Sequence, residues 1–402
     1  MLPALFLATT LALPARQASA IDAIVTQVMH DQRIPGLSLG VGRGNDVLYL
    51  RAYGTRDPAT HAKADPYTIY RIGSITKQFT AALVLGASER GELRLDEHLP
   101  DGRTVAELLA QSNGTTWEYD NANYLALGDV LKTATHRDFA ALLEQRIVAP
   151  LHLVSTSAGL PQARNVASAP LARPRDLPER TGAAAAMSSN VPDLLRWLAA
   201  LRDGRVISRH DVTEMTTTRY LRDGRPTNYG YGFFVDRWYG RPVAEHPGYL
   251  DGFSAIDALD VGNGLAIVIL TNADRVDLVP LAKSIFAIAR AQRDARGSAF
   301  ARPPENENPA ATAALGRVIA ELARGDVDRS LLTPAYAARL TRSAIAPLAA
   351  RLAPLGPLRL AEFLSRDGDV ERYRLSFAHA QLIARMPFRD GKIDGLVLES
   401  SP

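Results

Sequence analysis

The order of strand-like and helical segments constrains the fold of this chain more than any other feature. Two strand-like stretches, residues 37–42 and 46–53, come early, and the turn residues between them favour a hairpin. A long region of helical periodicity then extends to about residue 215. Strand patterns return after it and are followed by a closing helix, at residues 229–238, 252–259, 265–271 and 279–293. This order predicts an α+β fold, in which an antiparallel sheet carries helices and a helical insertion separates its strands.

The N-terminal end differs from this central region. Residues 1–20 resemble an export signal, because an apolar run leads to the small residues Ala18-Ser19-Ala20 and is too short to span a bilayer. No Lys or Arg precedes the run, so one element of such signals is missing. We therefore expect an exported, periplasmic protein that is cleaved near Ala20 and keeps no transmembrane segment.

A Pro-containing stretch near residue 300 divides the rest of the chain. We expect a main domain over residues 21–298, a linker over residues 299–310 and a small C-terminal α+β domain over residues 311–402. The small domain is predicted to contain two helices and two hairpin turns, at residues 311–323, 333–352, 367–368 and 390–391. It shows no group of residues typical of catalysis.

Composition excludes several classes of function. The chain has no cysteine, which rules out a thiolate nucleophile, a cysteine-based zinc site and disulfides. Its net charge of +3 arises from 46 basic and 43 acidic residues, and no basic stripe concentrates that charge. We therefore expect no nucleic-acid partner. The sequence leaves the oligomeric state open.

Two serine motifs compete for the role of nucleophile. Ser38 lies in a G-x-S-x-G pattern, which serves catalysis where a strand turns sharply into a helix. Strand-like residues follow Ser38, so a serine inside an ordinary strand is the better interpretation. Ser74 and Lys77 form the pattern S-x-x-K at the start of a predicted helix over residues 75–90. We therefore favour Ser74.

The spacing of Ser74 and Lys77 suits nucleophilic catalysis. Residues three apart on a helix share a face and are about 4.5 Å apart along the axis, so the amine can reach the hydroxyl. A lysine with its ordinary pKa of about 10.4 is a poor proton acceptor at neutral pH. Apolar neighbours lower that pKa, and Ile72, Phe79 and Leu83 would supply them. If it stood alone, the pattern would favour an ordinary capped amphipathic helix with a snorkelling lysine.

Two further motifs follow in the chain, Y-x-N at Tyr119 and Asn121 and H-x-G at His246 and Gly248. With S-x-x-K, and in this order, they resemble the serine β-lactamase and penicillin-binding protein superfamily. The similarity is greatest to its class C-like branch, which includes DD-peptidases and esterases. It covers residues 21–293 and implies a β-lactamase/transpeptidase-like fold.

The resemblance implies a role for each motif. Ser74 becomes acylated, and Lys77 and Tyr119 share the proton transfers. Asn121 binds a carbonyl of the substrate, while His246 and Gly248 lie on a strand at the edge of the cleft. The backbone N–H groups of Ser74 and Tyr249 form an oxyanion hole, since that site needs two donors. The resemblance implies neither a metal nor a cofactor.

Two departures from the family shape the expected activity. The segment before Tyr119 is short, which would open the cleft or displace Tyr119. The family's K-T-G is replaced by H-P-G, and Pro247 offers no donor for a carboxylate. We therefore expect a hydrolase of esters or D-amino-acid peptides, with a weak β-lactamase or a degenerate ligand-binding protein as alternatives.

Overall fold

The computed structural model describes residues 12–170, 178–296, 308–356, 358–377 and 380–400. The chain forms two compact units, residues 1–296 and residues 297–402, and each is described by itself. Much of the predicted export signal and most of the predicted linker lie outside the described residues. Among the described residues, no helix has the length and apolar character to cross a membrane.

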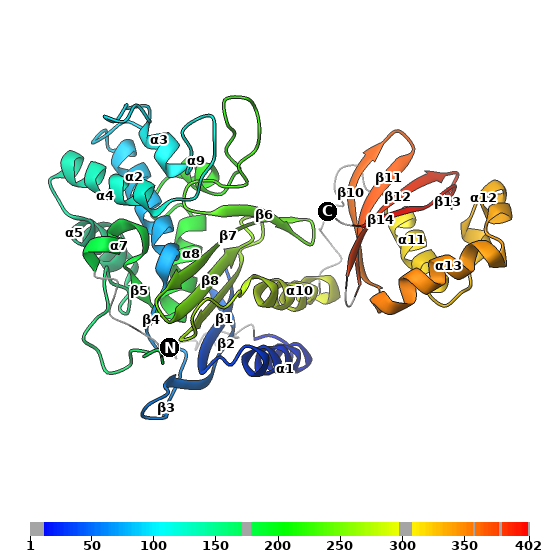
Figure 1. The fold of residues 1–402 in the computed structure, drawn as a ribbon, viewed down its shortest axis with the longest axis horizontal. Coiled ribbons are helices and arrows are strands. Elements are labelled where there is room, and N and C mark those ends of the chain that lie inside the picture. The colour runs from blue at the N-terminus through cyan, green and yellow to red at the C-terminus, as the bar shows by residue number, and fades with distance from the viewer. Residues whose placement is uncertain (1–11, 171–177, 297–307, 357, 378–379, 401–402) are drawn as a thin grey trace, which may run out of the picture. The chain divides into compact units, whose positions relative to one another are not determined.

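The first unit is built on an antiparallel sheet with the order β3-β2-β1-β9-β8-β7-β6 (Figure 1). The early hairpin pairs with the last strand, so the two ends of the unit meet in the middle of the sheet. The strands are β1 Gly36–Arg43, β2 Asp46–Asp57, β3 Ala62–Lys63, β6 Phe234–Trp238, β7 Arg241–Leu250, β8 Phe253–Leu259 and β9 Leu265–Thr271. The helical region between β3 and β6 is the predicted insertion.

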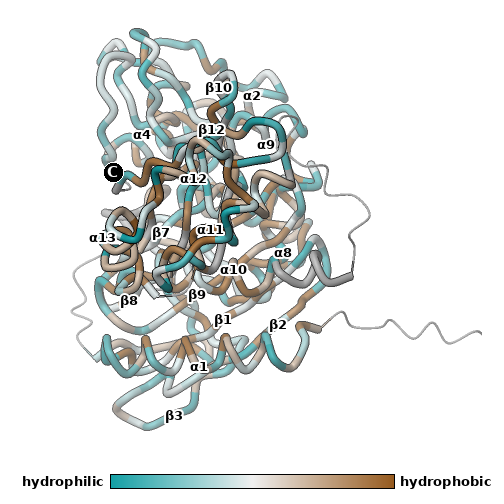
Figure 2. Tube along the Cα trace, turned by 90° about the vertical axis from the view of Figure 1, so that its right-hand side faces the viewer, coloured by the Kyte–Doolittle hydropathy of each residue, from teal (hydrophilic) through white to brown (hydrophobic). Residues whose placement is uncertain are grey.

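Each face of this sheet is covered by helices, because its central strands are apolar on both sides. Helices α1 Ala15–Asp31 and α10 Val279–Arg296 cover one face, and α8 Val191–Arg202 covers the other (Figure 1). Along β9 the residues alternate between the two faces with period two. Leu265, Ile267 and Ile269 join the core beneath α1 and α10, and Ala266, Val268 and Leu270 join the core beneath α8. Figure 2 shows the matching pattern on α1, whose colour alternates between hydrophobic and hydrophilic.

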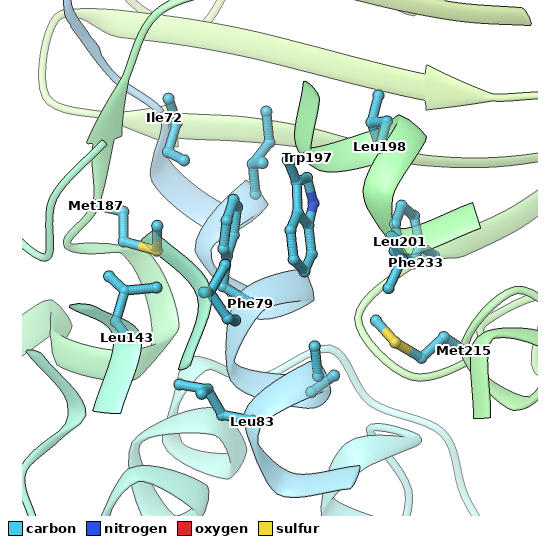
Figure 3. Close-up of a cluster of buried hydrophobic side chains, with 14 of the residues drawn as sticks. Ile72, Phe79, Leu83, Leu143, Met187, Trp197, Leu198, Leu201, Met215 and Phe233 are labelled. Carbon is cyan, nitrogen blue, oxygen red and sulfur yellow. The ribbon is translucent and has the colours of Figure 1, made fainter. Parts of the chain in front are cut away.

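The helical region is organised around α2 Thr76–Glu89, which follows a short 3₁₀ turn, η1 Gly73–Ile75. Its first twelve residues are all buried, so α2 runs through the core rather than over it. Phe79 stacks on Trp197 of α8 with ring centroids 4.0 Å apart (Figure 3). Shorter elements surround α2: β4 Tyr70–Arg71, α3 Val105–Leu109, α4 Asn121–Thr135, α5 Phe139–Leu143, η2 Glu144–Val148, α6 Ala149–Leu151, α7 Pro178–Ala185, β5 Ser188–Ser189 and α9 Arg209–Met215.

Three details differ from the expectations. The strand predicted over residues 229–238 begins only at Phe234. Periodicity did not reveal β7, because Pro242 and Pro247 disfavour a strand; pairing with β6 and β8 outweighs them. The helix predicted over residues 333–352 is divided in two, because Thr341 leaves the helix and caps the next one.

The second unit is a small α+β body with its own core. Its sheet has the order β10-β11-β12-β13, and β14 also pairs with β12. The two predicted hairpin turns lie between β10 and β11 and between β12 and β13. The elements are α11 Pro309–Leu322, η3 Arg329–Leu331, α12 Pro334–Arg339, α13 Arg342–Leu352, η4 Ala353–Leu355, β10 Leu358–Asp367, β11 Val370–Phe377, β12 Gln381–Arg389, β13 Lys392–Ile393 and β14 Val397–Ser400.

Candidate active site

Ser74 lies in the turn η1, where two glycines let this turn press against strand β7. Gly73 has φ +52°, and a β-carbon there would come within 2.7 Å of the backbone nitrogen of Tyr249. A β-carbon on Gly248 would lie 2.0 Å from the carbonyl oxygen of Ile72. Only glycine fits at these two positions. The close approach brings the backbone at Ser74 beside that of Tyr249, as an oxyanion hole requires.

Lys77 is fully buried on the first turn of α2, and its amine contacts three oxygen atoms. Nζ lies 3.1 Å from Oγ of Ser74, 2.6 Å from Oδ1 of Asn121 and 3.0 Å from the carbonyl oxygen of Ala184. The last two atoms can only accept hydrogen bonds. A neutral amine satisfies both with its two N–H groups and leaves its lone pair directed at the hydroxyl of Ser74.

The surroundings of Lys77 favour this neutral amine. Burial lowers the pKa of Lys77 to about 7, and the negative charge of Asp120 partly opposes that shift. The predicted apolar neighbours Ile72, Phe79 and Leu83 are all buried. Above pH 7 the amine can therefore accept a proton from Ser74.

Tyr119 and Asn121 reach the same place from the start of α4. Asp120 caps this helix by accepting a hydrogen bond from the N–H of Ala122, which fixes where the helix begins. The ring centroid of Tyr119 lies 4.8 Å from Nζ of Lys77. Burial raises the pKa of Tyr119, and a hydrogen bond with Ser74 opposes that rise. The phenol therefore stays protonated beside the serine, despite the short segment before it.

His246 lies on β7, and it is buried and uncharged. Its Nδ1 is 2.7 Å from the carbonyl oxygen of Pro247, so Nδ1 carries the proton and donates. Its Nε2 lies 3.2 Å from the hydroxyl of Tyr229 and accepts from it. Burial, together with the charge of Lys77, lowers the pKa of His246 to about 3. The imidazole is therefore a neutral group and supplies no cation to the site.

Several residues near the site were not found by sequence analysis. The rings of Tyr229 and Phe234 contact both Tyr119 and His246, and Trp117 packs behind them. Phe234 stacks on Tyr119 with centroids 5.8 Å apart. Gln111 is buried and accepts hydrogen bonds from the N–H of Asp120 and the amide of Asn123. The concentration of aromatic residues at 229–234 was the only available signal, and it could not show which rings meet.

The other serine motif has a structural role. Ser38 lies inside β1 and is fully buried. Its hydroxyl donates to the carbonyl oxygen of Asp65 at 2.9 Å and lies 3.0 Å from the hydroxyl of Tyr70. The interpretation of Ser38 as a strand residue is confirmed. Over the described part of the chain, no three His, Asp or Glu side chains come together in a way that could hold a metal ion.

Comparison with protein families and curated proteins places the first unit. A family model described as Beta-lactamase matches residues 21–290. Protein flp of Staphylococcus aureus (strain N315) is 23% identical over 314 residues, which cover 63% of this chain and 62% of that protein. A D-aminopeptidase of Gluconobacter oxydans (strain 621H) is 24% identical over 294 residues, covering 59% of this chain and 56% of that protein. The chain thus spans less than two thirds of the length of these relatives.

Three proteins with solved structures illustrate the similarity in fold. A penicillin-binding protein homologue from Pyrococcus abyssi, an octamer, is 17% identical with a TM-score of 0.62, over 95% of this chain and 98% of that chain. D-amino acid amidase from Ochrobactrum anthropi SV3 is 20% identical with a TM-score of 0.61, over 69% and 100%. D-alanine carboxypeptidase AmpC from Burkholderia cenocepacia is 21% identical with a TM-score of 0.60, over 69% and 99%. The predicted fold is confirmed.

Proposed function

Because the chain belongs to the Beta-lactamase family, we propose that it is a serine hydrolase that forms an acyl-enzyme on Ser74. One observation carries this proposal: the amine of Lys77 lies 3.1 Å from Oγ of Ser74 and has two fixed acceptors, so that its neutral form can keep its lone pair for the hydroxyl of Ser74. A degenerate binding protein would have no need of a buried neutral base beside its serine. The geometry therefore favours turnover over ligand capture.

The proposed reaction uses the groups already described. Lys77 takes the proton of Ser74 as Oγ attacks the carbonyl carbon of the substrate, and the N–H groups of Ser74 and Tyr249 stabilise the oxyanion. Tyr119 donates its proton to the leaving group as the bond to the carbonyl carbon breaks, and it regains a proton from the protonated Lys77, so that both groups return to their starting states. Asn121 uses its oxygen for Lys77, so its amide nitrogen is left to donate to the substrate. Water then attacks the acyl-enzyme and releases the acid.

The side chains of strand β7 at the edge of the site help to decide which class of substrate can bind. His246 is neutral, and Pro247 has neither an N–H nor a hydroxyl to offer. A substrate carboxylate, such as that of a β-lactam or of a C-terminal D-alanine, would find no charged partner there. We therefore propose small esters and amides or peptides of D-amino acids as substrates. The names of the D-aminopeptidase and the D-amino acid amidase support this choice.

A substrate panel tests the proposal. One preparation is assayed with a p-nitrophenyl ester, a D-amino-acid amide, a D-Ala-D-Ala peptide and nitrocefin, while a fluorophosphonate probe is followed by intact-mass spectrometry. We expect one label per chain, with turnover of the ester or amide well above that of nitrocefin. Ser74→Ala should abolish the label and lower turnover about 10⁴-fold or more. Nitrocefin as the best substrate would instead identify a β-lactamase, and an unlabelled, inactive chain would identify a binding protein.

We further propose that the protein is exported to the periplasm and that residues 21–298 and 311–402 are separate domains. The described apolar cluster of the second unit is drawn entirely from residues 311–398, which supports the division. Ala18-Ser19-Ala20 lies inside helix α1, which begins at Ala15, so cleavage after Ala20 would remove more than the first turn of that helix. The mass of the chain recovered from the periplasm would show the cleavage, and limited proteolysis would show whether cuts concentrate at residues 299–310.

A further inference from the structure

A buried polar contact joins the catalytic helix to the sheet at a point that the reaction itself does not use. Gln78 directly follows Lys77 and is fully buried. Its Nε2 donates to Oδ1 of Asp257 on strand β8 at 2.5 Å. We propose that the carboxyl group of Asp257 is a positioning group. Through Gln78, it holds Lys77 in place relative to β7, the strand that carries Tyr249 of the expected oxyanion hole. This inference rests on the proposed function of Lys77.

The orientation of Gln78 is fixed by a second contact. Its Oε1 accepts a hydrogen bond from Nε1 of Trp197 at 3.0 Å. An indole N–H can only donate, so the amide oxygen must face Trp197 and the amide nitrogen must face Asp257. Trp197 is itself held by its stack on Phe79, one residue further along α2 (Figure 3). The amide therefore has a single satisfied arrangement.

Asp257 also lies next to the other half of the site. It is the cross-strand partner of His246 on β7, so the two side chains share one face of the sheet. The ring of His246 lies 5.8 Å from that of Tyr119. Two residues beyond His246, Gly248 presses against the turn that carries Ser74. Asp257 thus links α2, the helix that carries Lys77, to β7, the strand that carries His246.

A fully buried carboxyl group in such a place carries a cost that calls for an explanation. Its Oδ2 has no hydrogen-bond partner among the described residues. Burial raises the pKa of Asp257 to about 7, while Gln78 and the N–H of His246 oppose the rise. The titratable side chain that shares its face of the sheet is His246, and the charge of Asp257 also raises the pKa of Glu245, which points to the opposite face of β7. An apolar residue would avoid this cost but would give Gln78 no acceptor. An asparagine would keep a neutral acceptor for Gln78.

Small displacements of a catalytic group have large effects, because proton transfer requires hydrogen-bond distance. Asp257→Val leaves Nε2 of Gln78 without an acceptor and frees the first turn of α2 to shift. We expect kcat to fall about 10- to 100-fold with little change in KM. Asp257→Asn keeps an acceptor oxygen and should restore kcat to within about threefold of the original. Activity is normalised to the fraction of chains that fluorophosphonate labels, so misfolded protein does not enter the ratio.

A double-mutant cycle gives a second test in case Asp257→Val folds poorly. Gln78→Met removes the amide at similar volume, and it should lower kcat as Asp257→Val does. Because both changes break one contact, their combination should be no worse than either alone. The proposal is overturned if Asp257→Val keeps its kcat per labelled site, if Asp257→Asn loses as much as Asp257→Val, or if the two losses multiply. Labelling of the unmodified chain that disappears in Ser74→Ala tests the proposed function separately.

Discussion

The two faces of the central sheet bury different kinds of groups. The face beneath α1 and α10 is filled by aliphatic and aromatic side chains along β1, β8 and β9, and a buried carboxyl group of this face, that of Glu245, lies at its edge on β7. The face toward α2 and α8 buries a lysine, a glutamine, a histidine and an aspartate beside its apolar residues. Both faces are formed by the same strands, whose side chains alternate between one face and the other. The difference shows that one sheet can be a stable scaffold on one side and a chemical site on the other.

The free-energy cost of burying polar groups explains why the two faces of the sheet differ. A buried polar group without a partner costs free energy, so it is retained where its chemistry is used. On the α2 face the buried lysine, glutamine, histidine and aspartate each have at least one hydrogen bond, and these bonds hold the candidate site together. Apolar packing on the α10 face supplies stability without such constraints. Substitutions on the two faces should therefore have separable effects.

The largest separable effect is expected at Lys77. Lys77→Met removes the base at similar volume, and activity should fall about 10²- to 10⁴-fold, the usual contribution of a general base. The unmodified protein should show kcat/KM rising with pH through about 7, because only the neutral amine accepts a proton. A pH–rate profile measures both, and a rise that persists unchanged in Lys77→Met would contradict the assignment.

The same substitution changes how stability depends on pH. Between pH 7 and about 10.4, the lysine is charged when the chain is unfolded and neutral when it is folded. The unfolded state then binds more protons, so this group makes the free energy of unfolding increase with pH across that window. Urea unfolding at several pH values should show a smaller increase in Lys77→Met than in the unmodified chain.

On the opposite face the expected effect is on stability alone. Ile267→Ala removes a fully buried side chain beneath α1 and α10 and should lower the free energy of unfolding by about 2–5 kcal/mol. Ile267→Val is the matched control and should cost about 0.5–1.5 kcal/mol. Both variants should keep kcat per labelled site and the pH–rate profile. A large loss of kcat in the folded fraction would mean that the two faces are not independent.

The smallest effect is expected from a charge at the edge of the site. Asp120 raises the pKa of Lys77, so Asp120→Asn should move the acid limb of the profile to lower pH. At pH 6 we expect relative activity about two- to threefold higher than in the unmodified protein, and less at high salt. Asp138→Asn changes another helix-capping aspartate, on α5, and should leave the limb in place. An equal shift in both variants would exclude a local effect of Asp120.

Sequence patterns predicted much of the scaffold, because strand and helix periods depend on local spacing. The early hairpin, β9 and the closing helix α10 begin where their patterns placed them, within one residue. Motif order predicted the family, and the apolar residues around Lys77 predicted a buried amine. Strand β7 was missed by periodicity, because two prolines obscure a strand that is decided by its pairing with β6 and β8.

By itself, the sequence determined the alternation of faces, the one-turn spacing of Ser74 and Lys77 and the family to which the chain belongs. Only the tertiary structure decided which polar groups meet. The carbonyl oxygen of Ala184 lies 107 residues from Lys77, and Asp257 lies 179 residues from Gln78. No local period connects such distant residues. Burial and hydrogen-bond partners set the protonation of a side chain, and both are fixed only when these segments pack together.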